Sequence, residues 1–224
     1  MHTKTFSIDP SERQNYADLL VALWPGLKWR HTGIGALQAY IREGNARELR
    51  VHIWHPSLVK PGIEDSGLCH DHRFDMRSSV LTGKIIQTEF ALEPDPDGDW
   101  ETHSVLHARS AMAKGGSFHQ GPVATGDYYR RQATVFEVSV GQGYTFDKFA
   151  FHESRAEGVT ITLVEKLAQE KVDARILAPR GKLVVHAFTE TQSPAEFAGA
   201  LAVGLAALLP IVKPQRRQTC LHRT

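Results

Sequence analysis

The chain has little cysteine and almost no net charge, and each shortage excludes a class of protein. Its two cysteines, Cys69 and Cys220, cannot build the disulfide framework of a small secreted domain. The 26 lysines and arginines nearly balance the 25 aspartates and glutamates, so a net charge of +1 gives no overall field that would attract nucleic acid. The first residues also lack the apolar core of a signal peptide. We therefore expect a cytoplasmic protein that binds neither nucleic acid nor a membrane.

Long hydrophobic runs are also scarce, and the one candidate is Phe197 to Val212. This run is shorter than the roughly 20 residues that a membrane-spanning helix needs, and it contains Pro210. The preceding Ser193-Pro194-Ala195-Glu196 is a capping box with proline in its first turn, which predicts a helix over about 194–212. We expect this helix to pack against the core or against a second copy of the chain, as in a homodimer.

A second helix is predicted near the N-terminus, over about residues 10–24. Asp9 to Glu12 forms a capping-box-like start with proline at its first position, and Pro25-Gly26 ends the pattern. Between the two helices, over about residues 36–188, short strand-like runs alternate with turn signals every ten or so residues. Such spacing is typical of an antiparallel sandwich or barrel. The sequence therefore predicts one all-β domain over 1–224, with helices only at its two ends.

Two loops interrupt the predicted strands. Residues 93–99 are acidic and contain two prolines, and they lack the glutamate of a calcium loop, so we interpret them as a solvated turn. Residues 112–127 are glycine-rich and are expected to form a flexible insertion, either inert or a flap over a site. The expected strands cover 37–42, 49–54, 80–92, 100–107, 134–140, 144–151, 159–164, 174–177 and 183–188.

The tripeptide His70-Asp71-His72 is the most specific pattern in the chain. Residues two apart in an extended segment project from one face, so both imidazoles can bind one metal ion, whereas Asp71 faces the opposite way. The chain has 12 histidines, so such a pair can also arise by chance. A third ligand could come from His103 and His107, which lie on one predicted strand, or from His152.

Two blocks around these histidines resemble the motifs of the cupin superfamily. Gly67 to Gly83 resembles the first motif, which pairs His-x-His with a downstream glycine, and Gly143 to His152 resembles the second, which ends in a single histidine. The resemblance implies a single cupin domain, a small antiparallel β-barrel or jelly roll with flanking N- and C-terminal helices. It also implies that His70, His72 and His152 hold a divalent metal ion.

One ligand of the usual cupin site has no counterpart in this chain. The first motif normally carries a glutamate shortly after His-x-His, but Met76 and Arg77 stand there, and the nearest acid, Asp75, comes one or two positions early. A cupin with three histidines and no glutamate resembles the thiol dioxygenases, such as cysteine dioxygenase. Many members of that family carry a cysteine cross-linked to a tyrosine where this chain has Arg77, so we expect no such cofactor.

The similarity to thiol dioxygenases extends over roughly residues 40–166. Three short segments resemble motifs of that family: the sequence His-Asp-His, the stretch Phe151-His152-Glu153, and Tyr40-Ile41-Arg42 ahead of a strand. In the family the corresponding arginine holds the substrate carboxylate, which implies that Arg42 binds substrate. The resemblance thus implies an Fe(II) dioxygenase that acts on a small carboxylate-bearing substrate, for example a thiol.

The residues themselves leave other chemistries open. Three neutral imidazoles suit Fe(II), Ni(II), Cu(II), Mn(II) or Zn(II) and leave about three octahedral positions for other ligands. A zinc or manganese isomerase or hydrolase could use the same site. A non-catalytic cupin that binds metal or senses a ligand is a further alternative, with Asp75 or His103 closing the coordination sphere.

Overall fold

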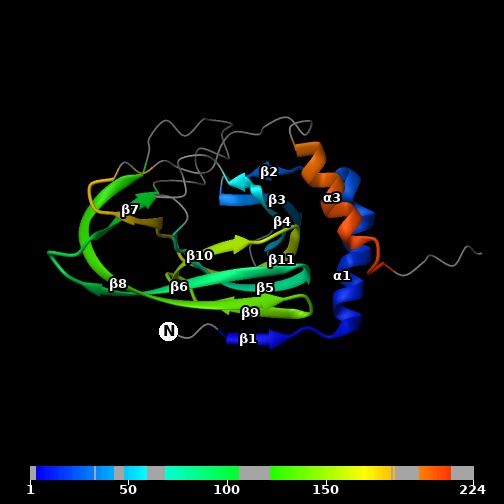
Figure 1. Ribbon diagram of the computed structural model, residues 1–224, viewed down its shortest axis with the longest axis horizontal. Coiled ribbons are helices and arrows are strands. Elements are labelled where there is room, and N and C mark those ends of the chain that lie inside the picture. The colour runs from blue at the N-terminus through cyan, green and yellow to red at the C-terminus, as the bar shows by residue number, and fades with distance from the viewer. Residues whose placement is uncertain are drawn as a thin grey trace, which may run out of the picture.

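The computed structural model of the chain describes residues 4–32, 34–42, 48–59, 69–105, 122–182, 184 and 197–212. Its strands are β1 (Lys4–Ser7), β2 (Arg30–His31), β3 (Ile34–Arg42), β4 (Glu48–Val59), β5 (Phe74–Thr82), β6 (Lys84–Pro94), β7 (Trp100–Val105), β8 (Val123–Ser139), β9 (Gln142–Phe146), β10 (Phe151–Ala156), β11 (Thr160–Gln169) and β12 (Ala174–Pro179). They form a seven-stranded sheet in the order β1-β9-β5-β11-β4-β3-β2 and a five-stranded sheet in the order β10-β6-β8-β7-β12 (Figure 1). Every pairing within the two sheets is antiparallel, which confirms the predicted all-β class.

Helices flank the sheets at both ends of the chain, as the sequence predicts. Helix α1 (Pro10–Leu23) begins at Asp9, whose side chain accepts a hydrogen bond from the backbone N–H of Ser11 at 2.7 Å, and a short 3₁₀ turn, Trp24–Gly26, follows it. Helix α3 (Ala198–Leu208) has no side-chain cap, and the capping box predicted at 193–196 lies outside the described residues. The two helices lie side by side at one end of the molecule in Figure 1.

Alternation along β4 separates two hydrophobic cores. Leu49, Val51 and Ile53 point toward the helices and pack with Leu20 of α1 and Leu208 of α3. The intervening residues of β4 point into the space between the two sheets, which is the expected period-two pattern of a strand buried on both faces. The seven-stranded sheet is therefore the middle layer of the molecule.

The core between the two sheets is rich in aromatic side chains. Trp54 of β4, Met76 of β5 and Phe146 of β9 pack there against Val138 of β8. The metal-binding histidines predicted from the sequence lie at the border of this cluster, because the ring of His152 stacks on Phe146 at a centroid distance of 4.2 Å. The inter-sheet core thus forms one wall of the candidate site.

Two predicted strands are each two strands in the structure. The run 80–92 turns at Gly83, which has a φ of 71°, and continues as β6. The run 144–151 ends at β9, turns through Phe149 and resumes as β10. Each turn contains polar residues or glycine, Gly83-Lys84 in the first and Asp147-Lys148 in the second, but the strand-like residues on both sides suggested a single strand.

The loop predicted at 112–127 overlaps a strand at its C-terminal end. Residues 123–127 belong to the long strand β8, whereas residues 106–121 lie outside the described residues, as does most of the strand predicted at 183–188. Strands β1 and β2, which are too short to give a periodic signal, were not predicted.

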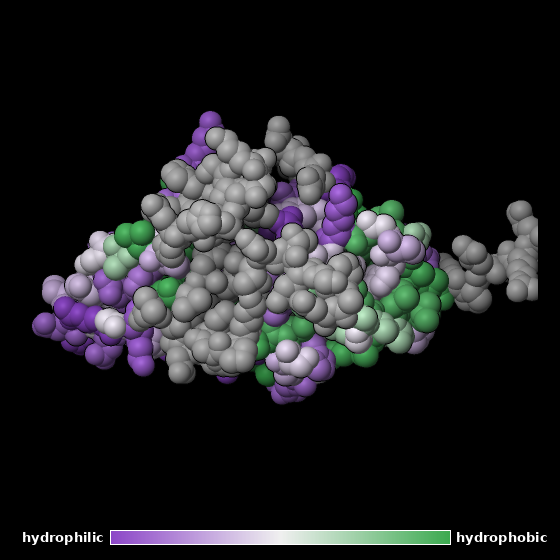
Figure 2. Space-filling model, turned by 90° about the horizontal axis from the view of Figure 1, so that it is seen from above, coloured by the Kyte–Doolittle hydropathy of each residue, from purple (hydrophilic) through white to green (hydrophobic). Residues whose placement is uncertain are grey.

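No helix among the described residues is long and apolar enough to cross a membrane. Val203 of α3 and Leu209, which follows its last residue, are nevertheless exposed, at 49% and 54%. Hydrophobic surface gathers at the end of the molecule that carries the helices (Figure 2). The homodimer expected at this helix stays a prediction.

Candidate metal centre

The segment that carries His70-Asp71-His72 joins the two end strands of the five-stranded sheet. His70 exchanges two backbone hydrogen bonds with His152 of β10, at N–O distances of 3.0 and 2.9 Å. On its other side the segment pairs with β12, where the N–H of Asp71 donates to the carbonyl of Arg175 at 2.9 Å. Because β10 and β12 are the two ends of the sheet, residues 69–71 connect these ends and close the sheet on itself. The tripeptide is therefore fixed by backbone bonds on both sides.

The three predicted histidines come together on the face of the closed five-stranded sheet that lies toward the seven-stranded sheet. The ring centroids of His70 and His72 are 4.8 Å apart, those of His70 and His152 are also 4.8 Å apart, and those of His72 and His152 are 5.0 Å apart. One nitrogen of each lies within 4.8 Å of the others, and His152 is buried while His70 and His72 are half-buried. The arrangement matches a three-histidine site for one metal ion.

Packing orients two of the three rings. The Nδ1 atom of His152 lies 3.0 Å from the carbonyl oxygen of Ala150, so Nδ1–H donates there and leaves the Nε2 lone pair for a metal. Phe146 covers one face of this ring, and Phe74 stacks on His72 at 4.7 Å with the two rings nearly parallel. Both imidazoles are thus held in one orientation before a metal binds.

The surroundings keep these imidazoles neutral. Burial lowers the pKa of His152 to about 3, and repulsion from His70 adds to the effect. Burial also lowers the pKa of His72 well below its usual value, with further contributions from the neighbouring histidines and from Arg50. Since only a neutral imidazole has a lone pair to donate, the site is ready to bind a cation at neutral pH.

Asp71 faces away from the histidines, as the sequence predicts. Its carboxylate accepts hydrogen bonds from the backbone N–H of Arg175 at 2.6 Å and from Nε of the same residue at 2.7 Å. Burial raises the pKa of Asp71, and the Arg175 guanidinium opposes that shift. The carboxylate therefore ties the metal-binding tripeptide to β12 and is not a ligand.

The alternative fourth ligands do not join the three histidines. Met76, at the motif position of the glutamate, is buried in the inter-sheet core. Asp75 instead accepts a hydrogen bond from the backbone N–H of Lys148 at 2.8 Å. His103 is buried on β7, and strand β12 lies between it and the tripeptide. Among the described residues, the group of possible ligands contains only the three histidines.

A basic side chain that the sequence analysis missed lies closer to the site than Arg42. Arg50 of β4 lies with its guanidinium carbon 5.6 Å from the centre of the Phe74 ring, which in turn stacks on His72. Its positive charge contributes to the lowered pKa of both His72 and His52. Arg50 is held in place by Glu48, which accepts from Nε at 2.5 Å.

Arg42 lies on the other face of the sheet. It is exposed and pairs with Leu49, which packs under the helices. Paired residues of adjacent strands share a face, so the register turns Arg42 away from the histidines. The predicted substrate-binding role of Arg42 therefore has no support in this geometry.

His52 is the second residue that the sequence analysis did not assign to the site. It lies between Arg50 and Trp54 on the site-facing side of β4, with its ring edge toward Trp54 at 5.6 Å. Burial lowers its pKa to about 3, and its buried Nδ1 atom has no hydrogen-bond partner among the described residues. The alternation Arg50-x-His52-x-Trp54 was the signal in the sequence that could have identified this face.

No protein-family model matches the chain, and no curated protein matches it. Solved structures with similar folds include HEPD from Streptomyces albus with 2-hydroxyethylphosphonate and Fe(II) bound, at a TM-score of 0.35 and 6% identity over 61% of this chain and 22% of that one. Oxalate decarboxylase from Lactobacillus farciminis matches at a TM-score of 0.39 and 11% identity over 67% of this chain and 33% of that one. A cupin-2 domain protein from Shewanella frigidimarina matches at a TM-score of 0.30 and 11% identity over 58% of this chain and 79% of that one.

The chain spans about a fifth to a third of the length of the first two proteins. All three TM-scores are below 0.5, so these similarities do not assign a chemistry. The chemistry has to be inferred from the three histidines and their surroundings.

Proposed function

We propose that the chain is a metal-dependent cupin enzyme, a three-histidine Fe(II) dioxygenase that acts on a small carboxylate-bearing substrate such as a thiol. The observation that carries this proposal is the convergence of His70, His72 and His152, which offer three nitrogen ligands within 4.8 Å of one another. Zn(II), Ni(II) and Mn(II) fit the same ligands. Iron held by three neutral ligands would supply neighbouring open positions for an anionic substrate and for O₂.

The protein would orient the metal ligands and leave the charge of the metal ion uncompensated. The hydrogen bond from Nδ1 of His152 to Ala150 fixes the tautomer that leaves Nε2 facing the site. Among the described residues no carboxylate joins the ligands, and Met76 occupies the inter-sheet core at the glutamate position. The full charge of the metal ion would then remain available to attract an anion.

Arg50 is the residue that we assign to the substrate carboxylate. Its guanidinium lies over the ring of Tyr40 at 4.8 Å and is braced by Glu48, so its orientation is fixed before substrate binds. A planar guanidinium can donate two parallel hydrogen bonds to a carboxylate. His52, two residues further along the same strand face, is a neutral hydrogen-bonding group on the same wall of the site.

Metal analysis of purified variants tests the ligand assignment. His152→Ala should lose stoichiometric metal, measured by elemental analysis of protein purified without added metal. His55→Ala is the matched control, because His55 is on β4 and bonds to Ser57 near the surface. Full metal content in His152→Ala would overturn the three-histidine site.

Oxygen dependence and a pair of arginine variants test the reaction. With small mercaptocarboxylates as substrates, turnover should consume O₂, and Arg50→Ala should raise KM about tenfold or more with metal content unchanged, the loss expected for a bidentate ion pair. Arg42→Ala should leave KM unchanged. Turnover without O₂ in a zinc or manganese protein would favour an isomerase or hydrolase, and a metal-loaded protein without turnover would favour a binding cupin.

A further inference from the structure

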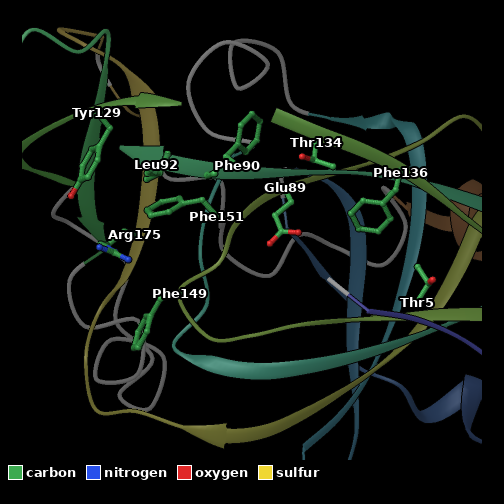
Figure 3. Close-up of a pocket in the computed structure, with 11 residues that line it drawn as sticks. Thr5, Glu89, Phe90, Leu92, Tyr129, Thr134, Phe136, Phe149, Phe151 and Arg175 are labelled. Carbon is green, nitrogen blue, oxygen red and sulfur yellow. The ribbon is translucent and has the colours of Figure 1, made fainter. Parts of the chain in front are cut away.

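A cavity of about 740 Å³ lies beside the strands that carry the candidate metal ligands. Figure 3 shows its wall, which is built from β1, β6, β8, β10, β12 and the turn between β9 and β10. None of the three candidate metal ligands lines it. The residues of the wall are Thr5, Glu89, Phe90, Ala91, Leu92, Tyr129, Thr134, Phe136, Phe149, Phe151 and Arg175.

Aromatic rings and one guanidinium dominate one end of this cavity. Phe149 and Phe151 lie beside Arg175, whose guanidinium carbon is 6.0 Å from the first ring centre and 4.9 Å from the second. Tyr129 lies toward the same end, whereas Glu89 lies away from it, toward Phe136 (Figure 3). A planar apolar body would therefore contact rings at the end where a positive charge is fixed.

Three residues of the wall are each joined directly to the metal-binding segments. The backbone N–H of Phe149 donates to the carbonyl of His72 at 2.7 Å. Phe151 immediately precedes His152 in β10, and Arg175 holds the carboxylate of Asp71. A molecule that moved this wall would also move the backbone that positions the ligands.

The backbone of Phe149 is strained. Its φ of 67° lies in the left-handed region, and among the described residues it is the only non-glycine residue with a positive φ. An aromatic residue adopts this conformation at a cost, and such strain concentrates where a fold must aim a side chain at a binding site. Here the strained turn directs the Phe149 ring into the cavity while its N–H holds His72.

We propose that this cavity is a second ligand site, which binds a small aromatic carboxylate and is coupled to the metal centre. The aromatic ring of the ligand packs among Phe149, Phe151 and Tyr129, and its carboxylate accepts hydrogen bonds from Arg175. The Nε of Arg175 already donates to Asp71, but a guanidinium has five N–H donors and can serve two carboxylates. The binding step does not depend on the proposed oxidation chemistry.

Titration calorimetry with cinnamate on the metal-free protein tests the site. Leu92→Trp should fill the aromatic end of the cavity, where Leu92 lies between Phe151 and Tyr129 (Figure 3), and weaken cinnamate binding about tenfold or more, since it removes the space for the ring. Val135→Trp is the matched control, because Val135 is 63% exposed and is not part of the wall. Cinnamyl alcohol, which keeps the ring and lacks the carboxylate, should bind more weakly than cinnamate.

Arg50→Ala distinguishes the cavity from the proposed substrate site. Cinnamate binding should be unchanged in this variant if the ligand lies in this cavity. The proposal is overturned if cinnamate does not bind at millimolar concentration, if Leu92→Trp binds it as the unaltered protein does, or if Arg50→Ala abolishes binding.

A metal titration tests the coupling. Saturating cinnamate should change the Kd for Co(II) about fivefold or more, and Co(II) should change the Kd for cinnamate by the same factor. The effect should vanish in Leu92→Trp, which separates it from direct coordination of cinnamate to the metal. An unchanged Co(II) Kd, or an equal effect in Leu92→Trp, would refute the coupling.

Discussion

His70 and His152 are held face to face by two reciprocal backbone hydrogen bonds, at N–O distances of 3.0 and 2.9 Å. In an antiparallel pair of this kind both side chains leave the same face, so two of the three proposed ligands are placed by the backbone alone. A slip of one residue in this register would present Phe151 or Glu153 in place of His152. The precision of the site therefore depends on what holds residues 69–71 against their neighbours.

Asp71 is the side chain that fixes this segment on its other side, and its removal should weaken metal binding. In Asp71→Ala the tripeptide loses both side-chain hydrogen bonds to Arg175 and keeps only the backbone bond, so its two histidines are less well oriented. Groups that orient metal ligands typically contribute 10–100-fold in affinity, so we expect a loss of about that size in the Co(II) Kd. Asp71→Asn keeps an acceptor for the Arg175 backbone and should lose less.

The turn at Gly83 should be less tolerant of a side chain than the turn at Gly141. Both residues have positive φ angles, 71° and 81°. A Cβ at Gly83 would lie 2.5 Å from the carbonyl oxygen of Val159 and 2.5 Å from Oγ1 of Thr160, whereas a Cβ at Gly141 meets nothing within 4 Å. Gly141→Ala should cost about 1–2 kcal/mol from backbone strain alone, and Gly83→Ala should cost clearly more, measured by urea denaturation. Equal losses would show that the close contact at Gly83 does not matter.

The fold class and the three histidines were predictable because each leaves a local signal. Alternating apolar residues mark strands such as β4, and His-x-His places two imidazoles on one face of an extended chain. The partner of that pair required a contact between distant segments, and only the resemblance to the second cupin motif favoured His152 over His103. Residue spacing alone did not distinguish them.

The prediction for Arg42 shows that sequence patterns alone do not determine which face of a sheet a residue lies on. Arg42 and Arg50 stand on adjacent strands, and a register irregularity lies between Tyr40 and Arg42 in their pairing. Such an irregularity changes which residues share a face, and it has no signature in the sequence. The strained turn at Phe149 was not predicted either, because the strand-like residues on both sides of it suggested one continuous strand.

Substitution of the alternative fourth ligands should leave the metal in place. Asp75→Ala removes a carboxylate that bonds to the Lys148 backbone, and His103→Ala removes an imidazole beyond β12, so neither changes the three-histidine group. We expect both variants to retain one equivalent of metal by elemental analysis, with some loss of stability. Loss of metal from either variant, at a temperature where it remains folded, would instead support a closed site with four protein ligands.

The metal-free protein should lose stability as the pH falls from about 6.5 toward 3. Burial lowers the pKa of His152 and of His52 to about 3, whereas an unfolded histidine titrates near 6.5. Between these values the unfolded state binds more protons than the folded state, so acid favours unfolding, and above pH 6.5 the contribution is fully present. His152, which is 2% exposed, should contribute a slope of about 1.4 kcal/mol per pH unit in this window.

Urea denaturation of the metal-free protein at a series of pH values between 7.5 and 4.5 measures that slope. His152→Gln removes one titrating group, so the fall in unfolding free energy with acid should become shallower by about the contribution of one histidine. His55→Gln removes an imidazole near the surface, and the slope should stay as it is in the unaltered protein. If His152→Gln and the unaltered protein have the same slope, then His152 takes up its proton at the same pH in the folded and unfolded states, and burial does not keep it neutral for a metal ion below pH 6.5.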